Sequence, residues 1–339
     1  MKKVLILFCG GTIIMKQQKN EEGILELKPP KNKEDSVKIL QEIAPKLKIK
    51  KDNIEFIANI DSTEIQPEYW DIIINRINEK YEDYDGFVIT HGTDTLAYTA
   101  SALSIGLENI NKPVVLTGSQ IPGCEINNDA TRNLVNSVLL AKKNIRGVYI
   151  VFDERIILGA RATKISESKL DAFRTVNNGD IGEITVDINL DRSCYEMRAE
   201  KLNINTGFES DIFVYQVTPG CDPSDLTFLL EKNKFRGIIL RGYGTGNIPK
   251  NFEKFFKEAD AKNFPIVINT QCLHGMTSIG VYESGNWYVK FKNVIDGYDQ
   301  SIETLTVKLQ HALSKFDDVI KIKKYVHKNF CGEINQKYL

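Results

Sequence analysis

The chain has 339 residues, and at about 150 residues per domain this length indicates two domains with a substantial buried core. Hydrophobic residues make up 42% of the sequence and charged residues 26%, a composition that excludes a disordered, collagen-like or membrane-spanning chain. Its 44 basic and 45 acidic residues give a net charge of −1, so we expect neither nucleic acid nor a membrane surface as a partner.

The six cysteines lie singly along the chain, with no C-x-x-C pair and no histidine at metal-ligand spacing beside them. This pattern predicts reduced thiols and no metal site. The first apolar run, Val4–Cys9, stops at Gly10-Gly11 and is shorter than the apolar region of a signal peptide. It therefore predicts a buried first strand and a cytoplasmic protein.

Short apolar runs then alternate with segments of helical period, which predicts parallel strands joined by crossover helices. The expected strands of the first half are Val4–Phe8, Ile54–Ile60, Phe87–Thr90, Val114–Thr117 and Val148–Phe152. The expected helices between them are Pro67–Tyr81, Asp94–Glu108 and Asp129–Lys142. The first of these has a proline suited to a first turn and one apolar face.

A polar, charged stretch around residues 191–211 interrupts this alternation. The expected elements after it are strands Ile212–Val217, Gly237–Leu240 and Pro265–Asn269 and a helix over Ile302–Leu313. We therefore expect an N-terminal catalytic α/β domain over 1–195, a linker over 196–211 and a C-terminal α/β domain over 212–339. The lysine-rich end, 321–339, is expected to be a solvated helix or tail.

Polar residues gather where the first three strands end, at Gly10-Gly11-Thr12, Asp61-Ser62-Thr63 and His91–Thr95. In an open parallel sheet these loops share the carboxyl edge, where such folds bind ligands. The two glycines permit positive φ, so the Thr12 hydroxyl can stand clear of the sheet. Taken singly, the first loop is equally explained as a tight turn, and Thr93 or Asp94 as a helix N-cap.

The glycine loop lacks the G-x-G-x-x-G spacing and the Lys-Ser/Thr ending that phosphate-binding loops need, so we do not expect a dinucleotide. Residues 15–33 are polar and interrupted by glycine and proline, which predicts a mobile flap over the site.

A hydroxyl nucleophile needs an activating group, and Lys164 follows a strand that ends near the same edge. Burial lowers a lysine pKa and a carboxylate such as Asp94 raises it, so whether Lys164 acts as a base stays open. His91 is expected to be a supporting residue.

These motifs together resemble the bacterial-type asparaginases, most closely the cytoplasmic type I group. The resemblance covers almost the whole chain. Its motifs are Gly10–Ile13, Asp61–Thr63, His91–Ala100, Thr117–Pro122, Asp129–Leu134, Thr163-Lys164, Arg241–Asn247 and Thr270–Cys272. The two threonine motifs in this order are specific jointly, and they outweigh the simpler explanations of each loop.

The resemblance implies an α/β fold with a larger N-terminal doubly wound, mostly parallel sheet domain and a smaller C-terminal α/β domain. It also implies hydrolysis of L-asparagine to L-aspartate and ammonia without metal or organic cofactor. By the resemblance Thr12 is the nucleophile, and Thr93, Asp94 and Lys164 form a second catalytic cluster. A carboxylate beside a lysine polarises Thr93 or a water that it holds, and backbone N–H groups stabilise the oxyanion.

The matched substrate-binding residues are Asp61, Ser62, Thr63, Thr93 and Asp94, which would hold the α-amino and α-carboxylate groups. The resemblance further implies a homodimer or homotetramer. Some type I enzymes carry a regulatory asparagine site, and its motifs match Arg241, Gly242, Tyr243, Thr270, Gln271 and Cys272. A glycine-rich turn after a strand explains Arg241–Gly246 equally well.

One departure from the family concerns the flap, where members commonly carry a tyrosine that assists the first threonine. This chain has no tyrosine between Thr12 and Glu68, so the proton relay to Thr12 stays open. Two alternatives to an asparaginase remain. One is the amidase subunit of a tRNA-dependent amidotransferase, although that subunit carries an N-terminal extension and the first strand here begins at Val4. The other is an amino-acid sensor without turnover.

Overall fold

The computed structural model describes residues 2–19, 21–28, 30, 32–280 and 286–338. The chain forms two compact units, Met1–Asn205 and Thr206–Leu339, each with its own parallel sheet. The short strand β14 (Asn203–Ile204) pairs with β6 (Leu107–Glu108), so the end of the polar stretch packs on the first unit. None of the helices in the described ranges combines the length and the apolar character that a membrane crossing requires.

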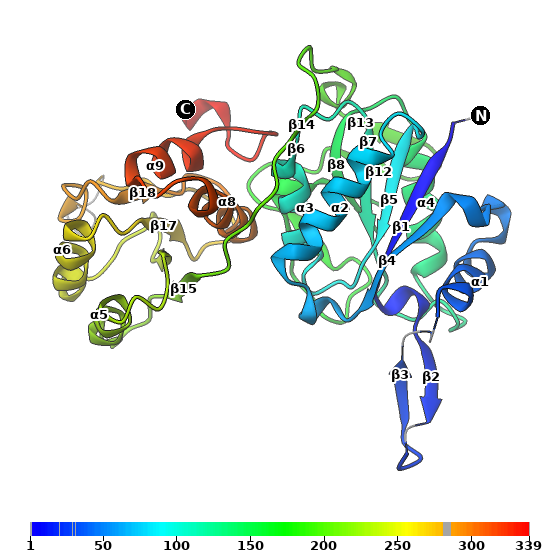
Figure 1. Ribbon diagram of the computed structural model, residues 1–339, viewed down its shortest axis with the longest axis horizontal. Helices are drawn as coiled ribbons and strands as arrows, with labels where there is room; N and C mark the ends of the chain where they lie inside the picture. The colour runs from blue at the N-terminus through cyan, green and yellow to red at the C-terminus, as the bar shows by residue number, and fades with distance from the viewer. Residues whose placement is uncertain (1, 20, 29, 31, 281–285, 339) are drawn as a thin grey trace. The chain divides into compact units, whose positions relative to one another are not determined.

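The first unit is built on an eight-stranded sheet (Figure 1). Its parallel part contains, in sheet order, β4 (Ile54–Ile60), β1 (Val4–Gly10), β5 (Gly86–Thr90), β7 (Pro113–Thr117) and β8 (Gly147–Phe152). The order continues with the antiparallel strands β9 (Arg155–Leu158), β12 (Gly182–Ile184) and β13 (Ile188–Leu190). The mostly parallel sheet is confirmed. The antiparallel extension was not predicted, and it begins at a tight turn in which Asp153 has a φ of 58°.

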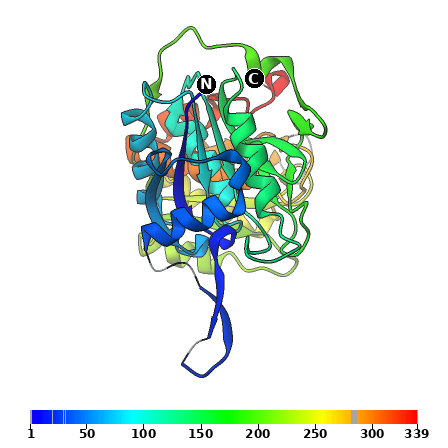
Figure 2. The same cartoon turned by 90° about the vertical axis from the view of Figure 1, so that its right-hand side faces the viewer.

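Helices cover both faces of this sheet (Figures 1 and 2). The helices α1 (Lys33–Ile43) and α4 (Ala130–Ala141) lie on one face, and α2 (Pro67–Glu79) and α3 (Leu96–Gly106) lie on the other. Side chains alternate along a strand, so Ile6 and Phe8 pack in the core with α1 and α4 while their neighbours face the other layer. All of β1 is buried because both faces are covered. The predicted doubly wound arrangement is confirmed.

Two hairpins extend from this unit. The strands β2 (Lys16–Lys19) and β3 (Leu25–Lys28) form an antiparallel hairpin that projects from the body of the unit, within the segment expected to be a flap (Figure 1). The strands β10 (Ala162–Lys164) and β11 (Phe173–Thr175) form the second hairpin.

In both units, short 3₁₀ turns occur at Thr12–Ile14, Pro45–Leu47, Lys51–Asn53, Ser62–Glu64, Gly159–Arg161, Arg192–Tyr195, Lys250–Phe252 and Gln336–Tyr338.

The second unit is a parallel α/β layer of four strands. Its strands in sheet order are β15 (Ile212–Gln216), β16 (Gly237–Gly242), β17 (Ile266–Thr270) and β18 (Val294–Asp296). The helices among its described residues are α5 (Ser224–Glu231), α6 (Glu253–Ala261), α8 (Ile302–Lys315) and α9 (Val319–His327). One core cluster lies with α5 and α6 and another with α8 and α9. The predicted C-terminal α/β domain is confirmed, whereas β18 was not predicted.

The lysine-rich end, expected as a solvated helix or tail, does contain a helix, α9, but the described residues up to 338 are not all solvated. Ile322 and Val326 of α9 are buried against the sheet, because their helical spacing gives the lysine-rich helix an apolar face. Beyond the helix, the Glu333 carboxylate is fully buried and pairs with Lys308 of α8 at 2.8 Å. The segment around Glu333 is therefore buried in the second unit.

Candidate functional site

The loops that follow β1, β4 and β5 lie in direct contact at the carboxyl edge of the first sheet. A Cβ placed on Gly11 would lie 2.6 Å from the carbonyl carbon of His91 and 2.7 Å from the Gly92 nitrogen. A Cβ on Gly92 would lie 2.5 Å from the Ser62 Oγ. Only glycine permits these approaches, and Gly11 also has a φ of 96°. The predicted convergence of the three loops is therefore a result of backbone packing through glycine.

Thr12 begins the 3₁₀ turn that continues β1, and it is half-buried while Ile13 and Ile14 are buried. The two isoleucines anchor the turn in the core, and the Ile13 carbonyl accepts a hydrogen bond from the Gly123 N–H at 3.2 Å. Within the described ranges no hydrogen-bond partner of the Thr12 Oγ1 is present. The turn thus holds the threonine backbone and leaves its hydroxyl available.

The loop after β4 is closed by its own aspartate. The Asp61 Oδ1 accepts hydrogen bonds from both the N–H and the Oγ1 of Thr63, each at 2.9 Å. Ser62 is buried, and its carbonyl accepts from the Thr95 Oγ1 at 2.6 Å. Asp61 and Thr63 are exposed. The loop is therefore rigid and tied to the loop after β5, with a carboxylate open to solvent.

Lys164 brings the second group of predicted residues together. Its Nζ donates to the Thr93 Oγ1 at 2.7 Å and to the Asp94 Oδ1 at 2.6 Å. The lysine side chain is only 18% exposed, although Asp94 is 57% exposed. The alternative that Thr93 or Asp94 serves as an N-cap is wrong, because α3 has Thr95 at that position and no side-chain cap bond. An ammonium group thus joins a hydroxyl and a carboxylate from the neighbouring loop.

His91 lies beneath this cluster and is buried. Its Nδ1 is 2.7 Å from the Gly92 carbonyl oxygen and its Nε2 is 3.0 Å from the Thr99 Oγ1, which also accepts from the Trp70 Nε1 at 3.1 Å. A carbonyl only accepts, so Nδ1 carries the proton and Nε2 accepts from Thr99. Burial lowers the pKa of His91 to about 4. A neutral imidazole that holds the turn before Thr93 fits the expected supporting role.

Gln120 lies in the motif Thr117–Pro122, but the sequence pattern assigned it no role. It follows β7, the strand next to β5, and its Oε1 accepts from the Thr93 Oγ1 at 3.2 Å. Its Nε2 donates to the carbonyls of Ser166 and Lys169 at 3.3 and 3.2 Å. Its position at the end of an adjacent parallel strand was the available signal, since all such ends share one edge.

The six residues matched to a regulatory site lie together at the carboxyl edge of the second sheet. Gly242 and Thr270 are register partners on β16 and β17, and the Gln271 Nε2 donates to the Arg241 carbonyl at 2.8 Å. The Cys272 N–H donates to the Thr270 Oγ1 at 3.0 Å. Tyr243 closes a glycine turn through its N–H to the Asn247 carbonyl at 3.0 Å. In the described part of the unit, the Arg241 Nε and the Tyr243 hydroxyl are buried and have no hydrogen-bond partner.

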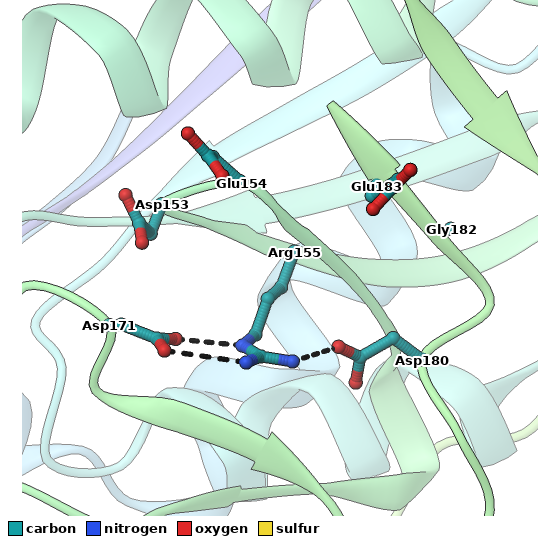
Figure 3. A pocket seen from close by; sticks show the side chains of 7 residues that line it. All are labelled: Asp153, Glu154, Arg155, Asp171, Asp180, Gly182 and Glu183. Carbon is teal, nitrogen blue, oxygen red and sulfur yellow. Dashed lines mark hydrogen bonds and ion pairs between the residues drawn. The ribbon is translucent and has the colours of Figure 1, made fainter. Parts of the chain in front are cut away.

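A cavity of about 350 Å³ lies elsewhere in the first unit and contains none of the predicted site residues (Figure 3). Its lining consists of Asp153, Glu154, Arg155, Asp171, Asp180, Gly182 and Glu183. Arg155 at its centre pairs with Asp171 at 2.8 Å and with Asp180 (Figure 3). Among the residues that the structure describes, no group of three or more His, Cys, Asp or Glu side chains is arranged to hold a metal ion.

Comparison with known proteins finds a family-model match for each half of the chain. Residues 3–195 match the family model described as asparaginase, N-terminal, and residues 211–326 match the glutaminase/asparaginase C-terminal domain. The L-asparaginase of Thermococcus kodakarensis is 36% identical, over 98% of this chain and 99% of that protein. L-asparaginase 1 of Escherichia coli K12 is 34% identical, over 98% of each.

Solved structures and a second group of relatives add to this comparison. The thermostable L-asparaginase structure from Thermococcus kodakarensis has a TM-score of 0.87 at 35% identity, over 98% of this chain and 99% of that chain. A protein titled probable cytoplasmic L-asparaginase from Campylobacter jejuni has a TM-score of 0.78 at 26% identity, over 97% of this chain and 100% of that chain. A glutamyl-tRNA(Gln) amidotransferase subunit of Metallosphaera sedula is 30% identical, over 99% of this chain and 77% of that protein.

Proposed function

The chain belongs to the asparaginase family, and on this premise we propose that it hydrolyses L-asparagine to L-aspartate and ammonia. The observation that carries the proposal is the bridge from Lys164 to Thr93 and Asp94, built on a loop that contacts the loop of Thr12. Two hydroxyls, an ammonium group and a carboxylate lie at one edge of the first sheet. These are the groups that acyl transfer to water requires.

In the proposed reaction the Thr12 oxygen attacks the side-chain amide carbon of asparagine. The proton of the Thr12 hydroxyl passes to the amide nitrogen, the C–N bond breaks, and the nitrogen leaves as ammonia. Water next attacks the resulting ester carbon: its hydroxyl stays on that carbon, which releases aspartate, and its other proton goes to the Thr12 oxygen. Its uncommitted hydroxyl supports Thr12 as the nucleophile, because nothing among the described residues has to be displaced first.

The cluster around Lys164 would position and polarise the second hydroxyl. The ammonium group withdraws electron density from the Thr93 oxygen and stabilises negative charge that develops beside it. The Asp94 carboxylate accepts from that ammonium group at 2.6 Å and holds it in place. Asp61 and Asp94, both exposed, would receive the substrate ammonium, while Ser62 and Thr63 would receive its α-carboxylate.

The test is ammonia release across asparagine concentrations, repeated with glutamine. We expect turnover of asparagine to exceed that of glutamine, and Thr12→Ala and Lys164→Ala each to abolish it while the folded state persists. Thr185→Ala and Lys143→Ala, which remove exposed side chains of the same types, serve as matched controls. Binding of asparagine by calorimetry without ammonia release would instead indicate an amino-acid sensor.

The relationship to the glutamyl-tRNA(Gln) amidotransferase supports a second candidate, ammonia production for tRNA-dependent amidation. It predicts a preference for glutamine and co-purification with a tRNA-binding protein. The higher identity to the L-asparaginases over nearly their full length favours the first function. The Campylobacter relative's title supports a cytoplasmic location, and the family resemblance supports a homodimer or homotetramer, measurable by sedimentation.

We further propose that the edge of the second sheet binds asparagine as a regulator. The buried and unsatisfied Arg241 Nε and Tyr243 hydroxyl support this, because such atoms ordinarily have partners. A sigmoidal dependence of rate on asparagine that becomes hyperbolic in Arg241→Ala is the expected result. A hyperbolic curve in the unmodified protein refutes it.

A further inference from the structure

The side chain of Gln120 makes three hydrogen bonds, and their directions are set by chemistry. The carbonyl oxygens of Ser166 and Lys169 only accept, so the amide NH₂ group must face them. Rotation of the amide by 180° would place its oxygen against two carbonyl oxygens. The Gln120 Oε1 therefore faces Thr93 and accepts the hydroxyl proton at 3.2 Å.

This orientation also assigns the proton of Thr93. The Lys164 ammonium group only donates, so the Thr93 oxygen accepts at 2.7 Å from Lys164 and donates to Gln120. One lone pair of the oxygen remains free. An amide oxygen is far too weak a base to remove the threonine proton, so in this arrangement Thr93 is an acceptor toward a water or substrate and not an ionised nucleophile.

The same amide holds the segment that follows Lys164. Ser166 and Lys169 lie in the loop between β10 and β11, directly after the lysine. The far end of that loop is held by Asp171, which pairs with Arg155 at 2.8 Å (Figure 3). Asp171 also pairs with Arg174 at 2.5 Å. Gln120 thus ties the loop that carries Lys164 to the hydroxyl that Lys164 contacts.

The backbone of Gln120 is itself fixed. Its N–H and that of Ile121 donate to the two oxygens of Asp129, each at 3.0 Å, and Asn133 donates to the same carboxylate at 3.1 Å. Asp129 and Asn133 are buried. The carboxamide therefore extends from a rigid support.

We propose that Gln120 is a positioning residue for the hydrolytic reaction: its amide directs the Thr93 proton away from Lys164 and holds the lysine loop in register with that hydroxyl. The proposal rests on the proposed function. It predicts that loss of the amide lowers turnover more than substrate affinity, since Gln120 acts through Thr93 and Lys164.

The first test is Gln120→Met, which keeps the length of the side chain and removes all three hydrogen bonds. We expect kcat to fall about 10-fold and KM to change less than about 3-fold, as for the loss of one or two hydrogen bonds that matter in the transition state. The control is Gln41→Met, the same replacement at an exposed glutamine that donates to the Ile49 carbonyl at 2.9 Å. An unchanged kcat in Gln120→Met overturns the proposal.

The second test is Gln120→Glu, which separates positioning from mere space filling. A protonated carboxyl can accept from Thr93 and donate to one carbonyl, whereas an ionised carboxylate can only accept and is repelled by both carbonyls. The ratio of variant to unmodified kcat should therefore fall as pH rises through the titration of the new carboxyl, whose ordinary pKa is about 4.3. A ratio that is flat from about pH 4 to pH 8 or that increases with pH overturns the proposal, even where Gln120→Met fails to fold.

Failure of the hydrolytic function and failure of the positioning role give different results. An unmodified protein that releases no ammonia from asparagine or glutamine refutes the proposed function. An active unmodified protein with equally active Gln120 variants refutes only the positioning role.

Discussion

Replacement of Gly11 by alanine tests the contact that brings the two threonine loops together. The added Cβ would lie 2.6 Å from the His91 carbonyl carbon, whereas carbon atoms in contact are about 3.5–4.0 Å apart. The obstructing atoms belong to the backbone and cannot rotate away, so the loops must separate by about 1 Å. Such a misplacement of catalytic groups costs about 100-fold in rate. The Gly11 backbone, with φ 96° and ψ 163°, lies in a region that essentially only glycine adopts, so a side chain there adds strain of about 1–3 kcal/mol to the folded state.

The assay combines kcat/KM for ammonia release with urea denaturation. Gly220→Ala is the matched control, because Gly220 has a φ of 81° and nothing within 4 Å of its added Cβ. We expect both variants to lose about 1–3 kcal/mol of stability from backbone strain, Gly11→Ala to lose more because of the clash, and only Gly11→Ala to lose activity. Gly11→Ala with more than about a third of the normal kcat/KM would show that loop contact does not align Thr12 with Thr93.

Three further predictions concern buried polar groups. Lys308→Met should cost about 3–5 kcal/mol in denaturant unfolding because it leaves the Glu333 carboxylate buried and unpaired, and adding Glu333→Gln should recover part of that loss. His91 has a pKa of about 4 in the folded state against 6.5 ordinarily, so the unfolded chain binds more protons between these values. Stability measured by denaturant midpoints should accordingly be lost as pH falls from about 6.5 to about 4, and His91→Gln should flatten that slope. Thr99→Val should destabilise by about 1–3 kcal/mol, since the His91 Nε2 and the Trp70 N–H lose their partner, and Thr99→Ser should restore stability.

The local pattern of the sequence predicts much of the fold. The strand Ile54–Ile60 has the predicted bounds, and the other strands of the parallel core differ from the prediction by one or two residues. Long apolar runs and apolar residues at helical spacing indicate which faces of a segment are buried, whichever elements pack against it. The hairpin β2–β3, the strand β18 and the antiparallel strands β9, β12 and β13 lack such runs or are very short, so their pairing depends on neighbours that are distant in sequence.

The sequence by itself determined which loops end the parallel strands, and so it placed Thr12, Ser62 and Thr93 at one edge of a sheet. The glycines next to Thr12 and Thr93 were the visible sign that backbones approach closely there. Only the tertiary structure decided that Lys164 contacts Thr93 and Asp94, that Gln120 orients the hydroxyl, and that Glu333 and Ile334 are buried. A residue's place at a strand end depends on local backbone preference and burial. The direction of its hydrogen bonds depends on which donors and acceptors the whole packed chain brings within about 3 Å, and no local pattern specifies that.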